Sequence, residues 1–126
     1  MAYLSPRALA LGIALLAPIC AALSAPLAAC PQQRQGGHAL DSASVFNGPP
    51  DKQVELLPNF ANLEWDLAAI QEDARTRGES IYLVCKYKGV KSTVTIKLTN
   101  EATLCKAEGI KNRMVVSCSA ATPTKD

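Results

Sequence analysis

The clearest pattern in the chain is an alternation of apolar and polar positions in its C-terminal half. Between Ile81 and Lys88 the odd-numbered positions are apolar, and the even-numbered ones include Lys86 and Lys88. After a turn around residues 89–92, residues 93–98 alternate in the same way. A period of two in β-branched and aromatic residues is typical of half-buried strands. We therefore predict two antiparallel strands, with one apolar face and one face that presents lysines and threonines.

Further strands are expected after this pair. A third apolar run reaches Cys105, a turn is predicted near residues 108–112, and residues 114–118 close the sheet. Residues 119–126 are small, polar and Pro-containing, so they are predicted to form a flexible tail. The pattern as a whole predicts a mainly β fold with a small antiparallel sheet, arranged as a meander or a sandwich.

Residues 60–77 fit two patterns. A helical period places Phe60, Leu63 and Leu67 on one stripe that continues through Ile70 and Ala74. A period of two instead makes residues 62–67 a half-buried strand, followed by a charged loop. The sequence pattern by itself slightly favours the helix.

The segments before this region carry weaker signals. Residues 30–44 are polar, contain glycine and have no clear period, so at most a short strand is expected there. Residues 46–51 run from Phe46 and Asn47 into Gly48, Pro49 and Pro50, which is a dense turn signal. A Pro- and Gly-containing turn can preorganise a contact surface and lower the ordering cost of binding. The alternative is a structural corner between strands.

The N-terminus is typical of an exported precursor. Arg7 is followed by an uncharged, mostly apolar stretch from Ala8 to Leu23, which ends in small residues. This order is the signature of a secretory signal peptide, which we assign to residues 1–29. Prolines interrupt the run, so a membrane-spanning helix is not expected. The chain is therefore predicted to act in the periplasm or outside the cell.

The cysteine count bears on how the signal peptide is removed. Residues 27–30 (LAAC) spell a lipobox, after which Cys30 would carry a lipid anchor in the outer membrane. Plain cleavage just before Cys30, or a few residues earlier, leaves an even set of cysteines in an oxidising compartment. We favour the second alternative, with a single disulfide-bonded domain at residues 30–118. The disulfide framework is Cys30, Cys85, Cys105 and Cys118.

The predicted hairpin suggests how these cysteines pair. A turn centred on residues 111–112 places Cys105 opposite Cys118, within the Cα separation of about 4.4–6.8 Å that a disulfide needs. Cys30 is then left to pair with Cys85. A domain of this size is marginally stable, and each disulfide contributes about 2–4 kcal/mol.

Charge is distributed unevenly along the chain. Residues 30–79 hold four basic and eight acidic side chains, whereas residues 80–126 hold eight basic and three acidic ones. Such asymmetry either orients the molecule toward a charged partner, or the acidic and basic halves complement each other within one domain. A basic sheet with interleaved Tyr82 and Tyr87 could bind nucleic acid. Export and the small net charge count against that function, and we expect a solvated lysine face.

The sequence offers no catalytic constellation. His38 is the only histidine and lies in a Gly-rich polar segment, where a surface or capping role is expected. No nucleophile elbow, phosphate-binding loop or zinc-protease motif occurs, and no Cys or His spacing suggests zinc. We therefore expect neither enzymatic activity nor a cofactor or metal. The remaining class is a binding module, with Phe46, Asn47, Gly48, Pro49, Pro50, Lys86 and Lys88 as candidate partner-binding residues.

Several segments together resemble a family of small exported proteobacterial proteins of uncharacterised function, with a CP…GPP…CxY…C…C pattern. They are residues 45–50 (VFNGPP), 81–87 (IYLVCKY) and 96–98 (IKL), with Cys105, Cys118, Cys30-Pro31 and residues 38–40. The resemblance spans Cys30 to Cys118. It implies a mostly β domain in which residues 63–67 form a Trp-containing strand. Residues 68–77 then become an insertion with a helical turn.

Small exported disulfide-bonded proteins that lack an active site commonly act as inhibitors. By this analogy, our hypothesis is an immunity protein that neutralises a secreted toxin directed at the cell wall. Its partner would be a toxin or an envelope enzyme. The alternative is an envelope structural or ligand-binding protein without a toxin partner, including a lipoprotein.

Overall fold

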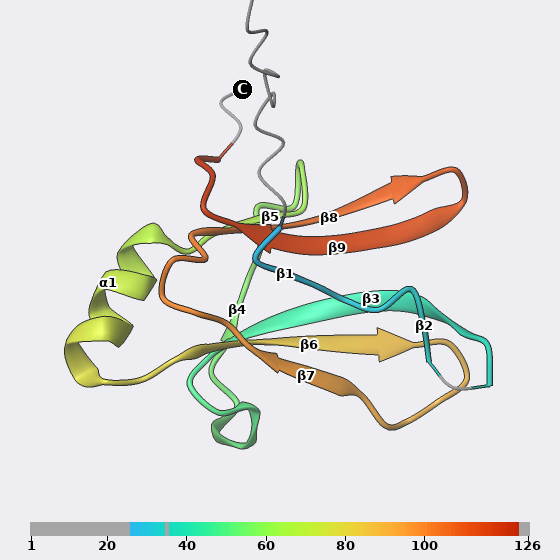
Figure 1. Ribbon diagram of the computed structural model, residues 1–126, viewed down its shortest axis with the longest axis horizontal. Coiled ribbons are helices and arrows are strands. Elements are labelled where there is room, and N and C mark those ends of the chain that lie inside the picture. The colour runs from blue at the N-terminus through green and yellow to red at the C-terminus, as the bar shows by residue number, and fades with distance from the viewer. Residues whose placement is uncertain (1–25, 35, 124–126) are drawn as a thin grey trace, which may run out of the picture.

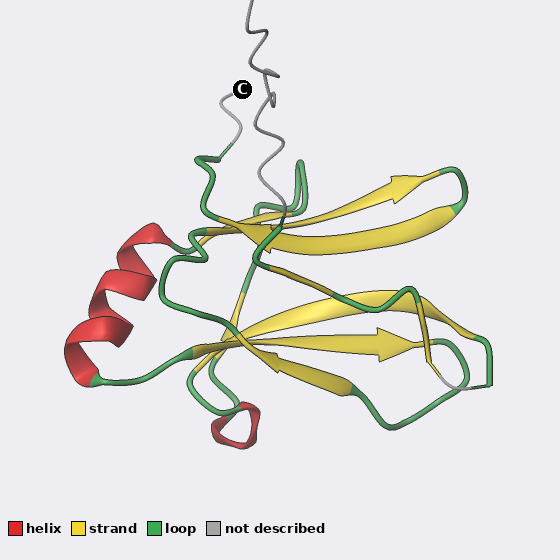
Figure 2. Cartoon of the chain, viewed as in Figure 1, coloured by secondary structure: helices red, strands yellow, loops and turns green. Residues whose placement is uncertain are grey.

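The computed structural model describes residues 26–34 and 36–123, so residues 1–25 of the predicted signal peptide lie outside the described residues. Two antiparallel sheets face each other, and one helix lies at one end of them (Figure 1). One sheet has the strand order β1 (Ala28–Ala29), β9 (Arg113–Ser119), β8 (Leu104–Ile110) and β5 (Glu64–Asp66). The other has the order β2 (Gln33–Arg34), β3 (His38–Asn47), β6 (Ile81–Tyr87) and β7 (Val94–Lys97), and β4 (Glu55–Leu56) also pairs with β3. The predicted mainly β fold is confirmed (Figure 2).

The core lies between the two sheets. Val45 of β3, Leu83 of β6 and Ile96 of β7 are cross-strand neighbours on the inner face, and the first two are fully buried. Because strand side chains alternate between faces, the alternation read in the sequence places these residues inside. Lys86 and Lys97 are exposed on the outer face, as predicted.

The β8–β9 hairpin turns where the sequence indicates. Ile110 pairs with Arg113, so Lys111 and Asn112 form a two-residue turn, and both have positive φ. Such a turn matches the right-handed twist of the flanking strands. The resulting register pairs Cys105 with Cys118.

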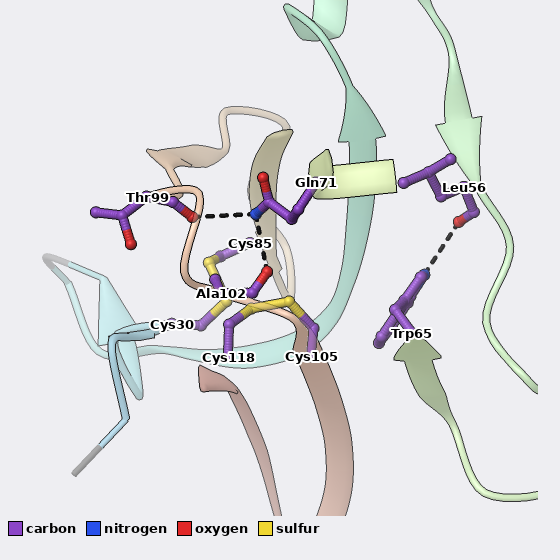
Figure 3. Close-up of a disulfide and its surroundings, with 9 residues drawn as sticks. All are labelled: Cys30, Leu56, Trp65, Gln71, Cys85, Thr99, Ala102, Cys105 and Cys118. Atoms are coloured by element: carbon purple, nitrogen blue, oxygen red, sulfur yellow. Dashed lines mark hydrogen bonds between the residues drawn. A yellow bond between two sulfur atoms is a disulfide. The ribbon is translucent and has the colours of Figure 1, made fainter. Parts of the chain in front are cut away.

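Both predicted disulfides are present (Figure 3). Cys105 and Cys118 bridge neighbouring strands with a Cα–Cα distance of 3.9 Å. The two residues are directly opposed in the ladder, and their separation is shorter than the range predicted from the sequence. Cys30, which follows β1, bridges to Cys85 of β6 with a Cα–Cα distance of 5.7 Å. This bond therefore joins the two sheets.

The helix α1 (Ala68–Arg77) covers one end of the core through a buried polar side chain. Gln71 is 1% exposed. Its Nε2 donates to the carbonyl oxygens of Thr99 and Ala102, at 3.0 and 2.8 Å (Figure 3). Its Oε1 accepts from Asn100 Nδ2. These bonds satisfy the buried amide and hold the loop between β7 and β8 against the helix.

Two sequence interpretations need correction. Residues 30–44 hold β2 and most of the ten-residue strand β3, rather than a short strand at most. The helical stripe is wrong for residues 60–67, where a turn and β5 are found, but right from Ala68 onward. The Trp-containing strand followed by a helical segment, which the family resemblance implied, is confirmed.

Candidate partner-binding groove

The predicted turn at residues 46–50 forms a corner at the end of β3. Gly48 has a φ of +95° and is buried, and its N–H donates to the carbonyl oxygen of Ser80 at 3.0 Å. Pro50 then begins the short 3-10 turn Pro50–Lys52. The left-handed conformation is one that glycine adopts without a steric cost, which explains Gly48 at this corner.

The structure separates the predicted binding residues. Asn47 pairs with Ile81 at one end of the β3–β6 ladder, and Leu40 pairs with Tyr87 at the other. The turn therefore lies at the opposite end of the ladder from Lys88, which directly follows Tyr87. Phe46 and Lys86 share the outer face of the sheet, where they pair with Tyr82 and Ser42 respectively. These side chains do not form one cluster, and their role in binding stays a prediction.

A different surface brings apolar side chains together. A hollow of about 240 Å³ opens between β3 and β5, and we call it the apolar hollow. Trp65 and Ala107 lie at its floor, because both are buried, and Leu57, Phe60 and Leu63 lie at its rim. The rim is unusual because Leu57 is 74% exposed and Phe60 is 71% exposed.

Hydrogen bonds fix the loop that carries this rim. The carbonyl oxygen of Asn59 accepts from Leu63 N at 2.7 Å, and Asn59 Oδ1 accepts from Ala61 N at 2.9 Å. Leu63 has a φ of +54°, a conformation that is uncommon for a branched residue. Trp65 anchors the preceding chain, because its Nε1 donates to the carbonyl oxygen of Leu56 at 3.0 Å (Figure 3). Phe60 is therefore exposed on an ordered turn.

A second hollow, of about 430 Å³, lies beside the first and has a different character. Lys88 and Arg113 line it, together with Asp41, Gln32 and Gln33, and we call it the basic hollow. Met114 lines both hollows, and the neighbouring residues Asp41 and Ser42 belong to one hollow each. The two hollows are thus neighbours between β3 and the β8–β9 hairpin, and we refer to them together as the groove.

A β-bulge shapes the groove at Asp41. Leu40 pairs with Tyr87 and Ser42 pairs with Lys86, so Asp41 is an extra residue in β3. Bulges turn a strand and redirect its side chains. Here the bulge lets Leu40 point into the core while exposed Asp41 lines the basic hollow.

Tyr87 supports the chain next to the basic hollow. It is buried, and its hydroxyl donates to the carbonyl oxygen of Pro31 at 2.7 Å. Burial raises the pKa of the Tyr87 phenol above its usual value, although the positive charge of Arg34 acts in the opposite direction. His38 is exposed as expected, and its Nδ1 lies 3.1 Å from the carbonyl oxygen of Lys88.

Tyr87 gives a testable pH dependence. The unfolded phenol loses its proton near pH 10, and the folded one does so at higher pH. The proton is therefore held more tightly in the folded state, and its contribution to stability is lost as the pH rises above about 10. We expect the free energy of unfolding from urea titrations to fall more steeply between about pH 9 and 11 in the wild type than in Tyr87→Phe. Equal slopes would contradict this.

Two further features are absent from the described part of the chain: a cluster of metal-ligating side chains and a membrane-spanning helix. Residues 26–34 and 36–123 contain no group of three or more His, Cys, Asp or Glu side chains that could hold a metal ion. Within the same residues, no helix has the length and apolarity needed to cross a membrane.

The comparison with protein families shows which family the chain belongs to. The family model of the type VI secretion system Tli immunity protein matches residues 32–121, well over half of the chain. The chain belongs to this Tli immunity family. No curated protein and no solved structure matches the chain.

Membership confirms the hypothesis of an immunity protein that neutralises a secreted toxin. As a Tli immunity protein, the chain has a toxin as its partner. The matched residues include Cys85, Cys105 and Cys118 but begin two positions after Cys30. The Cys30–Cys85 disulfide is thus a property of this chain on which the family match does not bear.

Sequence reasoning missed most residues of the groove. The helical period puts Phe60 and Leu63 on one apolar stripe, and no motif in the sequence singles out Arg113. One signal was available: Leu57-Pro58-Asn59 precedes Phe60, and Pro and Asn favour turns. An aromatic residue just after such a turn signal is a candidate for exposure.

Proposed function

We propose that this Tli immunity protein neutralises its toxin by binding it stoichiometrically in the periplasm, without catalysing a reaction. The observation that carries this proposal is the family match across residues 32–121, which covers every strand from β2 to β9. An exposed apolar rim on an ordered loop supports binding, because such surfaces commonly mark protein interfaces.

The disulfides support a location outside the cytoplasm. Such bonds persist in oxidising compartments such as the periplasm. The sulfur of Cys30 is bonded to Cys85, and lipidation would require that same atom. Ala28 pairs with Cys118 and Ala29 with Ser117 as β1, which supports cleavage at or before Ala28, earlier than the predicted end of the signal peptide at residue 29. The resulting protein is a free periplasmic domain rather than a lipoprotein.

Intact mass spectrometry of the protein purified from the periplasm tests this processing. We expect a chain that begins at or before Ala28, with two disulfides and no added lipid. A diacylated N-terminal Cys30 would contradict the proposal.

Co-expression tests the function. The cognate toxin is directed to the periplasm, where we expect it to arrest growth, and the exported immunity protein is expected to restore growth. A version without residues 1–25, which stays in the cytoplasm, is the control and should not protect. Titration calorimetry with the purified pair is expected to give a single fixed stoichiometry. Protection without binding would contradict an inhibitor and favour an enzyme.

The cell-wall target is the finer part of the proposal, and the same experiment tests it. Cells that express the toxin without its immunity protein are analysed for peptidoglycan fragments and for phospholipid breakdown products. Release of peptidoglycan fragments is expected. Breakdown of phospholipids with an intact wall would overturn the cell-wall target while leaving the immunity function in place.

A further inference from the structure

On the basis of the proposed function, we propose that the groove between β3 and the β8–β9 hairpin holds an extended segment of the toxin. This segment places an apolar side chain in the apolar hollow and carboxylates in the basic hollow. The inference names the docking surface and the chemistry of its occupant, and three observations carry it.

The first observation is the apolar end of the groove. Leu57 and Phe60 are about three-quarters exposed, although the turn that carries Phe60 is fixed by hydrogen bonds that Asn59 accepts from Ala61 and Leu63. An aromatic residue that is already ordered loses little conformational entropy on binding. The hollow beside it has Trp65 and Ala107 as a floor, so an incoming apolar side chain is enclosed on several sides. Enclosed apolar contacts of this kind dominate binding energy at interfaces.

The second observation is the charge at the other end. Lys88 and Arg113 line the basic hollow, and neither forms an ion pair with another described residue. Asp41 is the single carboxylate among the lining residues. Exposed Lys91 and Lys111 lie in the adjoining turns. Complementary charge steers association and selects acidic partners.

The opposite end of the molecule has the opposite character. Asp66, Glu72, Asp73, Glu79 and Glu101 lie in or beside α1, at the end away from the β8–β9 turn (Figure 1). Arg75 and Arg77 at that end are paired with carboxylates. The uneven distribution of charge along the sequence thus corresponds to an acidic end and a basic end of the molecule. The groove lies toward the basic end.

The third observation is an open strand edge between the two hollows. β3 pairs with β2 at residues 38–39 and with β4 at residues 45–46. Among the described residues, no strand pairs with residues 41–44 on this side of β3. Backbone groups on an open edge can accept an added strand. This edge favours an extended segment over a helix as the occupant.

Charge-reversal variants test the basic end against the purified toxin that the chain neutralises in the co-expression test. Lys88→Glu and Arg113→Glu are each expected to weaken binding at least about tenfold, mainly by slowing association. Lys97→Glu is the matched control, because Lys97 is exposed on the outer face of β7, away from the groove. Raising the NaCl concentration should weaken wild-type binding more than binding of the double variant. Equal losses for Lys97→Glu and the groove variants would overturn the charge argument.

The apolar end is tested by Phe60→Ser, with Val54→Ser as its control. Val54 is 49% exposed and lines neither hollow. Phe60→Ser is expected to weaken toxin binding about 30-fold or more by speeding dissociation, and Val54→Ser to leave it unchanged. Thermal unfolding of both variants should match the wild type, because neither side chain is buried. Wild-type affinity in Phe60→Ser would exclude the groove as the docking site.

The occupant is identified by crosslinking. A photo-reactive amino acid in place of Leu57 is expected to crosslink the toxin, and mass spectrometry should return an extended segment with at least two carboxylates. A crosslinked helix, or a segment without carboxylates, would overturn the proposed chemistry. A crosslink between two copies of this chain, with a dimer that Phe60→Ser dissociates, would make the groove a self-interface instead. If the wild-type protein does not bind the toxin at all, the proposed function fails; if it binds but the groove variants bind equally well, only this inference fails.

Discussion

Replacing Cys30 and Cys85 together by alanine is expected to lower the free energy of unfolding by about 4 kcal/mol. The two residues are 55 positions apart in the sequence. In the chain-entropy description, a crosslink stabilises by restricting the unfolded chain, and the restriction grows with the length of the closed loop. This bond also joins the two sheets, so its loss removes the covalent link between them.

The double variant Cys105→Ala/Cys118→Ala is the matched control. Its loop spans only 13 positions, which corresponds to about 3 kcal/mol. Strands β8 and β9 also remain paired by their own ladder on both sides of the missing bond. Chemical denaturation followed by Trp65 fluorescence measures both variants. A greater loss in the Cys105–Cys118 variant would contradict this ranking.

Replacing Trp65 by alanine is expected to cost about 3–5 kcal/mol. The side chain is 5% exposed and packs in the main core, between the sheets. Its indole N–H also satisfies the carbonyl oxygen of Leu56, which links β5 to β4 across the apolar hollow. The substitution removes the packing contacts and this hydrogen bond together.

Trp65→Phe separates the two contributions. It keeps most of the apolar volume but removes the donor, so a loss of about 1–2 kcal/mol is expected. Circular dichroism during thermal unfolding measures both variants. Equal losses in Trp65→Phe and Trp65→Ala would show that the hydrogen bond, not packing, stabilises this region.

The C-terminal half of the fold was predictable from the sequence because its signals agree. Alternation in β6, a two-residue turn at residues 111–112 and an even cysteine count lead to the same hairpin and the same disulfides. Each signal comes from neighbouring residues or from the pairing register of a single hairpin. When such signals agree, the sequence specifies one structure.

The strand β3 could not be read in this way. Residues 38–44 (HALDSAS) lack β-branched and aromatic residues, so their intrinsic preference for a strand is weak. Their place in the sheet comes from pairing with β6, and the bulge at Asp41 breaks the alternation. Residues 60–67 were ambiguous for a related reason, since Phe60 is apolar but not buried.

The groove could be predicted even less well than β3, because it is formed only by the tertiary structure. Its key side chains come from segments far apart in the chain: Leu57 and Phe60, then Lys88, then Arg113 and Met114. No spacing within the sequence reveals that these positions meet. The charge asymmetry between the two halves of the chain was visible, but only the fold shows which end of the molecule becomes basic.

The inter-sheet bond between Cys30 and Cys85 also links the stability of the domain to the redox state of its compartment. Cytosolic reductants keep such thiols reduced, so a newly made chain lacks the Cys30–Cys85 bond until it leaves the cytoplasm. We therefore expect the domain to reach its full stability only in the compartment where we place the toxin. A cell whose envelope cannot oxidise thiols is expected to hold a less stable immunity protein and to be less well protected. Resistance is then expected to depend on the oxidising capacity of the envelope as well as on gene expression.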